Sequence, residues 1–102
     1  MTELEKDIER KLRRIVERNR GLCLKWVCPG WSGVPDRIVL MPGGRIYFVE
    51  LKRPKGSKVG KLQDKWRDWL AELGFLVCRI YNECDLALFE RDIRGDEKQC
   101  QK

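Results

Sequence analysis

Two acidic residues and one lysine stand at matching ends of two neighbouring apolar segments. Asp36 follows the loop 33–35, while Glu50 and Lys52 close the segment 45–52. Hard divalent cations such as Mg²⁺ take carboxylate oxygens as ligands. An ammonium group beside such a cation can orient a water molecule or neutralise charge on a substrate oxygen. These side chains therefore predict a metal-assisted hydrolytic site, provided that the fold brings them together.

A β-hairpin would bring the acids together. The segments 37–41 and 45–52 are rich in β-branched and aromatic residues, and the turn formers at 42–44 separate them. If Met41 faces Arg45 across the turn, Asp36 faces Glu50, and the two opposed Cβ atoms lie about 4.5–5.5 Å apart. The hairpin therefore places both carboxylates at one end of the sheet.

The face of the hairpin that carries the acids follows from strand alternation. Lys52 shares the face of Glu50 and Asp36, while Leu51 points to the other side. Like charges directly opposite each other destabilise a sheet, and a cation between them would remove that repulsion. The alternative to a metal site is a surface ion pair at a strand end. A one-residue bulge in the glycine-rich turn would also break the register.

Composition narrows the class of protein. The chain has 102 residues, a net charge of +6 and no histidine, with a pI of about 9.2. That length suits one small domain, and the basic balance favours a polyanionic partner such as nucleic acid, with solubility alone as the alternative. Without histidine, the commonest general base is absent. Chemistry would then rest on carboxylates, lysine and a metal.

The cysteines and the hydropathy pattern predict the cellular compartment of the protein. Five cysteines without a C-x-x-C pair argue for free thiols in a reducing cytosol and against a zinc site. No segment is long and apolar enough to span a membrane, and the acidic, helical N-terminus does not resemble a signal peptide. We therefore expect a cytoplasmic protein, in a bacterium or in a phage-infected host cell.

The element pattern predicts an α/β fold. Apolar periodicity indicates helices over 3–19 and 59–73, the first ended by Gly21 and the second by Gly74. Strands are expected over 22–27, over the two hairpin segments 37–41 and 45–52, and over 75–81. A short helix from Asn82 to about Asp92 follows. The order is α-β-β-β-α-β-α, a small mixed sheet flanked by helices on both sides. We expect one domain over residues 1–94 and a polar, disordered tail over 95–102.

Other residues could support the acidic pair. Helical geometry places Glu5, and then Glu9, at the border of the apolar stripe of the first helix, although Glu5 could equally cap that helix. Gln63 lies at the corresponding border of the second helix and could orient a water or a phosphate, although an ordinary boundary residue would look the same. Trp31, in a glycine-flanked loop, could stack on a nucleobase or pack at a subunit interface.

A basic loop follows the second strand of the hairpin. Such a loop beside a metal site suits a phosphate backbone, and a solvated loop is the alternative. The basic residues concerned are Arg53, Lys55, Lys58 and Lys61. The tryptophans of the second helix, in contrast, have the spacing of core residues.

These motifs resemble a known family. Gly-Val-Pro-Asp-Arg at 33–37, Val-Glu-Leu-Lys-Arg at 49–53 and Gln63 on the following helix resemble the stand-alone VRR-NUC domain of phages and bacteria, a branch of the PD-(D/E)xK nuclease superfamily. The resemblance extends from the first helix to about residue 90. It implies a restriction-endonuclease-like core and a metal site made by Asp36, Glu50 and the main-chain carbonyl of Leu51. Lys52 and Gln63 match the family's catalytic lysine and glutamine, and Glu5 matches the glutamate of the first helix in related nucleases.

The resemblance also implies an activity. It predicts a Mg²⁺- or Mn²⁺-dependent endodeoxyribonuclease, a hydrolase acting on ester bonds, that forms a homodimer and cuts branched DNA such as Holliday junctions during DNA repair. No membrane and no nucleotide cofactor are expected. Two alternatives stay open: a non-catalytic DNA-binding module of a repair or replication assembly, and a nuclease without junction preference.

Overall fold

A single mixed sheet organises the chain. The computed structural model describes the backbone of residues 3–51 and 61–100, and the side chains of residues 6–51 and 62–94. In chain order the elements are α1 (Glu3–Arg18), β1 (Leu22–Lys25), β2 (Arg37–Met41), β3 (Arg45–Leu51), α2 (Lys61–Glu72), β4 (Leu76–Ile80) and α3 (Glu83–Cys100). The α/β class and the order α-β-β-β-α-β-α are therefore as predicted. The sheet order is β1-β2-β3-β4, and only the β3–β4 pair, which α2 connects, is parallel.

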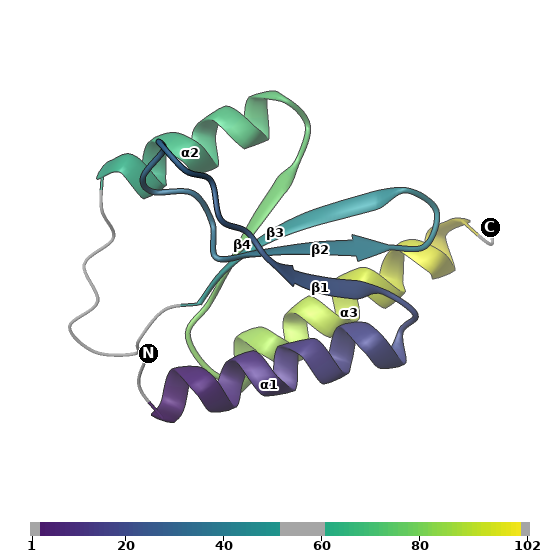
Figure 1. The fold of residues 1–102 in the computed structure, drawn as a ribbon. Helices are drawn as coiled ribbons and strands as arrows, with labels where there is room; N and C mark the ends of the chain where they lie inside the picture. The colour runs from purple at the N-terminus through teal and green to yellow at the C-terminus, as the bar shows by residue number, and fades with distance from the viewer. Residues whose placement is uncertain (1–2, 52–60, 101–102) are drawn as a thin grey trace.

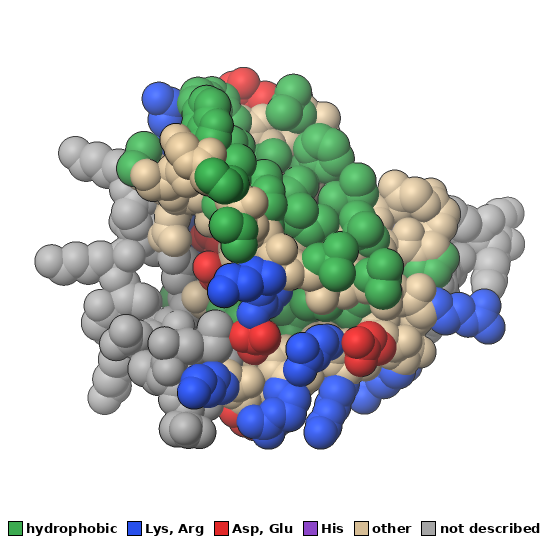
Figure 2. Space-filling view, viewed as in Figure 1, with side chains coloured by type: hydrophobic (Ala, Val, Ile, Leu, Met, Phe, Trp, Pro, Cys, Tyr) green, Lys and Arg blue, Asp and Glu red, His purple; other side chains and the backbone are tan. Residues whose placement is uncertain are grey.

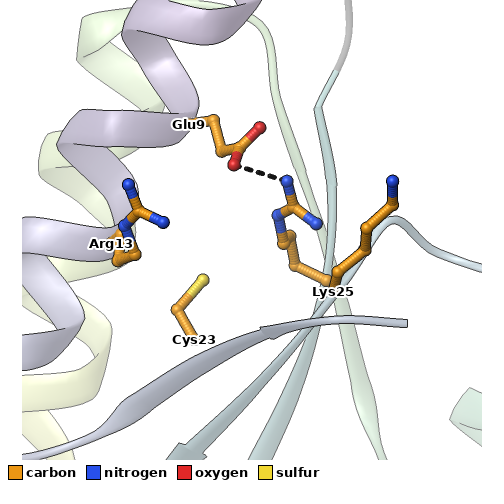
Figure 3. Close-up of a pocket in the computed structure, with 5 residues that line it drawn as sticks. Glu9, Arg13, Cys23 and Lys25 are labelled. Carbon is orange, nitrogen blue, oxygen red and sulfur yellow. Dashed lines mark ion pairs between the residues drawn. The ribbon is translucent and has the colours of Figure 1, made fainter. Parts of the chain in front are cut away.

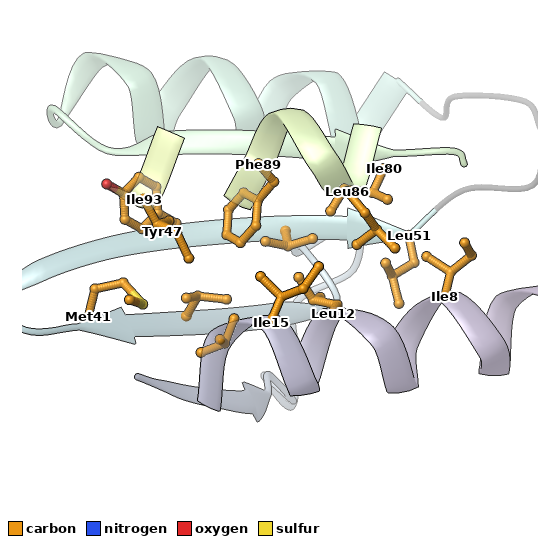
Figure 4. Close-up of a cluster of buried hydrophobic side chains, with 13 residues drawn as sticks. Ile8, Leu12, Ile15, Met41, Tyr47, Leu51, Ile80, Leu86, Phe89 and Ile93 are labelled. Atoms are coloured by element: carbon orange, nitrogen blue, oxygen red, sulfur yellow. The ribbon is translucent and has the colours of Figure 1, made fainter. Parts of the chain in front are cut away.

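One face of the sheet is closed by two helices. Figure 1 shows α1 and α3 side by side against this face, with α2 on the opposite side. The α1 residues Ile8, Leu12, Ile15 and Val16 are all buried, as their spacing predicts. They meet Val39 and Val49 of the hairpin, and Leu86, Phe89 and Ile93 of α3, in one cluster (Figure 4). This cluster is the hydrophobic core of the domain.

The other face is covered by aromatic contacts and is only partly closed. Trp26 packs on Phe48 with ring centroids 5.1 Å apart, and Trp66 of α2 meets Trp26 edge-on at 5.9 Å. Beyond this cluster, several large apolar side chains are exposed on and directly after α2, on β1 and on β3. These are Leu62 and Trp69 of α2, Leu73 directly after α2, Leu22 and Leu24 of β1, and Ile46 of β3. The interpretation of the α2 tryptophans as core residues is therefore met only in part, because Trp66 is half-buried whereas Trp69 is 41% exposed. Leu70 is the buried member of the apolar stripe of α2.

Two glycines act at helix ends for different reasons. Gly74 has φ 95°, and the N–H of Phe75 donates to Leu70 O at 2.8 Å, so Gly74 ends α2 as predicted. After α1, however, the residue with positive φ is Arg20 (φ 70°) and not Gly21. A Cβ on Gly21 would lie 2.4 Å from Met41 Sδ, so this glycine is required by close packing against β2.

The last helix is longer than its sequence pattern indicates. Asn82 Oδ1 accepts a hydrogen bond from the N–H of Asp85 at 3.0 Å, as expected of an N-cap residue. The helix expected to end near Asp92 continues to Cys100, which makes residues 95–100 helical where a disordered tail was expected. The domain boundary at residue 94 stays a prediction.

Two further observations concern thiols and membranes. Cys23, Cys28, Cys78 and Cys84 are free thiols, as expected, and Cys100 lies among the residues whose side chains are outside the description. Burial raises the pKa of the Cys78 thiol to about 11. Within the described segments, no helix combines the length and the apolar character that crossing a membrane requires.

Candidate active site

The hairpin has the predicted register. Met41 pairs with Arg45, and Arg37 pairs with Val49, so the next step along the two strands sets Asp36 opposite Glu50. Asp36 Oδ2 accepts a hydrogen bond from the N–H of Leu51 at 2.8 Å. The Asp36 carboxylate therefore reaches across to the backbone of β3 directly after Glu50, at the end of the sheet where the two acids were predicted to meet.

Glu50 is a buried acid with one oxygen unsatisfied. Its side chain is 0% exposed, which excludes the alternative of a solvated surface ion pair for this residue. Oε2 accepts a hydrogen bond from Arg79 Nε at 2.9 Å. Oε1 has no hydrogen-bond partner and is the unsatisfied atom found among the buried side-chain nitrogens and oxygens of the described residues. A buried carboxylate oxygen in this state is costly unless another group binds it.

Arg79 links Glu50 to the first turns of α2. Arg79 lies beside Glu50 in the parallel β3–β4 register, and its Nη2 donates to Asp64 Oδ1 at 2.7 Å. Burial lowers the pKa of Arg79, but the hydrogen bonds from its guanidinium to Asp64 and Glu50 outweigh this, and the net pKa is raised. The sequence did not single out this arginine. The available signal was a charged residue in the middle of a strand expected to be buried.

The loop before Asp36 is fixed by α2. Trp66 Nε1 donates a hydrogen bond to Ser32 O at 2.9 Å. Gly33 has φ 82°, and a Cβ on it would lie 2.7 Å from Leu62 Cβ and 2.9 Å from Leu62 C. A side chain at position 33 would thus be strained in its backbone and would clash with the helix. The glycine of the Gly-Val-Pro-Asp motif therefore lets α2 press directly on the loop that positions Asp36.

Glu9 of α1 lies on the other face of the sheet. Arg37 follows Asp36 and points to the opposite side, where Arg37 Nη2 lies 2.5 Å from Glu9 Oε1. Glu9, the second choice for a supporting glutamate, is thus paired with Arg37. Glu5, the first choice, lies outside the described side chains.

The structure describes some of the remaining predicted residues and not others. Gln63 is half-buried in the first turn of α2, next to Asp64, and it has an interaction partner. Trp31 is 58% exposed and contacts Trp66 edge-on at 5.5 Å. The predicted lysine and loop cations lie outside the described residues or side chains: Lys52, Arg53, Lys55, Lys58 and Lys61.

The residues described at this end of the sheet fit a hard cation. Among the described residues no three His, Cys, Asp or Glu side chains form a metal cluster. The fit rests instead on the unsatisfied Oε1 of Glu50 and on the Asp36 carboxylate, which is held against the adjoining peptide. Carboxylate oxygens of this kind are the ligands that Mg²⁺ and Mn²⁺ prefer.

Comparison with known proteins defines the family. No protein-family model matches the chain. A phage protein described as "Putative nuclease p44", from Acyrthosiphon pisum secondary endosymbiont phage 1, is 48% identical over 73 residues, which is 72% of this chain and 77% of that protein. A solved structure described as "VRR_NUC domain" superposes with a TM-score of 0.78 at 26% identity, covering 84% of this chain and 92% of that one. The chain therefore belongs to the VRR-NUC family of nucleases, and its fold is that family's fold.

Proposed function

We propose that the domain is a metal-dependent endonuclease that hydrolyses DNA phosphodiester bonds at the Asp36/Glu50 end of the sheet. The observation that carries this proposal is the buried Glu50 carboxylate, whose Oε1 lacks a partner while Asp36 is held beside it. The ion pair with Arg79 engages only Oε2 of Glu50 and leaves Oε1 unsatisfied, and a buried acceptor in this state is costly unless a further group binds it. An acid that awaits a cation accounts for both features.

Each residue of the proposed site would have its own role in the reaction. Asp36, Glu50 and the Leu51 carbonyl would hold Mg²⁺ or Mn²⁺, which when bound polarises a phosphoryl oxygen and lowers the pKa of a water molecule. Arg79 holds Glu50 Oε2, so that Oε1 is the oxygen left for the ion. We assign to Lys52 the orientation of the water or the neutralisation of phosphate charge, and to Gln63 and Glu5 supporting contacts to water and metal.

The decisive experiment compares two aspartates on one chain. Asp36→Asn should lower the cleavage rate by at least about 10³-fold, equal to about 4 kcal/mol of activation free energy, with no change in the far-UV circular dichroism spectrum. Asp68→Asn is the matched control, because its side chain is 71% exposed on α2. Lys52→Ala should behave like Asp36→Asn. Full cleavage by a purified Asp36→Asn protein would disprove these roles.

Branched DNA and a homodimer complete the proposal. A C2 dimer would present two sites with opposed polarity, which suits paired cuts in a symmetric four-way junction. The exposed apolar side chains on the α2 side of the sheet, gathered between α2 and β1 in Figure 2, support a second copy on this face. Trp31 and the cations of the basic loop would contact the DNA.

One assay separates this function from its alternatives. A four-way junction, a flap, a nicked duplex and a single strand are each incubated with Mg²⁺, Mn²⁺ or EDTA. Cleavage of the junction above the others supports the proposal, and equal cleavage of all indicates a nuclease without junction preference. Binding without cleavage under any metal indicates a DNA-binding module. The expected setting is DNA repair or replication in the cytoplasm of a bacterium or a phage-infected host.

A further inference from the structure

A small basic pocket lies on the face of the sheet opposite to Glu50. It has a volume of about 210 Å³ and is enclosed by α1, β1 and the start of β2. Figure 3 shows Glu9 and Arg13 directed from α1 toward the strands, above Cys23 of β1. The lining residues are Glu9, Arg13, Cys23, Lys25 and Arg37. This volume is below the roughly 300–1,000 Å³ of pockets for drug-sized molecules, so it suits a small ion or group.

The charges around the pocket do not balance. Three cations and one carboxylate line the pocket, and the Glu17 carboxylate is near enough to act on Cys23. Glu9 is paired with Arg37. The Arg37 side chain is only 9% exposed and that of Glu9 21%. Arg13 and Lys25 therefore supply a surplus of positive charge beside a buried guanidinium, and such an arrangement favours an anion. The planar fork of the guanidinium matches the oxygens of a phosphate group.

The pocket lies at the same end of the sheet as the proposed active site. Arg37 directly follows Asp36, Lys25 pairs with Arg37 across the β1–β2 ladder, and the N–H of Trp26 donates to Asp36 O at 3.0 Å. We propose that this pocket binds a backbone phosphate of the DNA at a position other than the cleaved one. The bound strand would thus contact both faces of this end of the sheet. The inference rests on the proposed function for the identity of the anion as DNA.

Binding tests the pocket without cleavage. Affinity for a fluorescent four-way junction is measured with Ca²⁺ in place of Mg²⁺ over a range of salt concentrations, for the wild type and for the double variant Arg13→Gln/Lys25→Gln. The variant should raise Kd about tenfold, and the slope of log affinity against log salt should become shallower by about one. The double variant Arg14→Gln/Arg91→Gln removes the same charge from exposed helix positions and is the matched control. It should change neither quantity appreciably.

Steady-state cleavage separates this inference from the proposed function. The pocket variant should raise KM and leave kcat nearly unchanged, because the contact is equally strong in ground and transition states. Three outcomes would each overturn the inference: equal effects of the two double variants, a fall in kcat alone, or a wild type that does not bind DNA. Cleavage by Asp36→Asn would overturn the proposed catalytic roles and leave the binding result for the pocket standing.

A chemical probe reports on the pocket in the unaltered protein. Cys23 lines it, whereas Cys84 is exposed on α3, and trypsin releases the two cysteines in separate peptides, 21–25 and 80–91. Alkylation is followed by mass spectrometry above the ordinary thiol pH range, because burial raises the pKa of Cys23. Saturating DNA should slow the labelling of Cys23 severalfold and leave Cys84 unaffected. Unchanged labelling of Cys23 would contradict the assignment.

Discussion

The two faces of the sheet are built for different purposes. The α1/α3 face carries the buried core and is closed by two helices. On the α2 face, one helix and a chain of aromatic rings cover part of the strands, while Leu73 remains 71% exposed and Leu24 45%. The buried acid Glu50 and its arginine lie on this less covered face. Stability is thus concentrated on the α1/α3 face, called the closed face below, and the charged groups of the proposed catalytic site lie on the α2 face, called the open face.

The largest expected difference between the faces is in stability. Leu12→Ala removes a fully buried side chain from the closed face and should lower the free energy of unfolding by about 2–5 kcal/mol. Leu73→Ala makes the same chemical change on the open face and should cost no more than about 0.5 kcal/mol. Urea unfolding followed by circular dichroism measures both. Similar losses would show that the α2 face is packed as tightly as the α1/α3 face.

A second prediction concerns the charges on the open face. Arg79→Met leaves the Glu50 carboxylate buried without its partner and should cost about 3 kcal/mol of unfolding free energy. Adding Glu50→Gln to that variant should restore much of the loss. Saturating Mn²⁺ should raise the melting temperature of Arg79→Met and not that of the double variant, since only the former keeps the acid. A destabilisation that Glu50→Gln does not relieve would show that Arg79 acts through packing alone.

A smaller effect is expected where the helices of the closed face meet. The hydrogen bonds from Arg18, together with that from Asn19, hold the pKa of Glu90 below its ordinary value, although burial opposes them. A carboxylate with a lowered folded-state pKa stabilises the fold above its unfolded-state pKa, and this stabilisation is lost as the pH falls through the folded-state value. Glu90→Gln should therefore cost about 1 kcal/mol near neutral pH and almost nothing in strong acid. Urea midpoints measured across this pH range should converge at the acid end, and parallel curves would contradict the linkage.

The smallest effect on the fold is expected from Leu24→Glu. This substitution places a charge among the exposed apolar residues of the open face, where it should leave the circular dichroism spectrum unchanged. If this face carries the proposed homodimer, light scattering should show the mass fall from that of two chains to that of one. Lys25→Glu, at the neighbouring position that faces α1, is the control and should keep the mass of the wild type. A wild-type protein that is already monomeric would exclude the dimer.

The two faces also differ in how well the sequence predicted them. The hairpin register was predictable because the turn at 42–44 fixes it locally, and the α1 stripe was predictable because a helix on a closed face buries its whole apolar side. The stripe of α2 misled, since periodicity identifies an apolar side but not how much of it another element covers. Arg79 was missed because its partners, Glu50 and Asp64, come from distant parts of the chain.

Gly33 carries no functional group, yet no larger residue fits in its place. With the Leu62 backbone carbon 2.9 Å from where a methyl group would stand, alanine at this position would push the loop and the helix apart. Such a protein would still fold on its α1/α3 side and keep every acid and base, while the aspartate three residues further on would be displaced. A genetic screen for inactive alleles should therefore recover substitutions of this glycine as well as of the acids themselves. Such an allele would keep every proposed catalytic side chain but hold Asp36 in the wrong position.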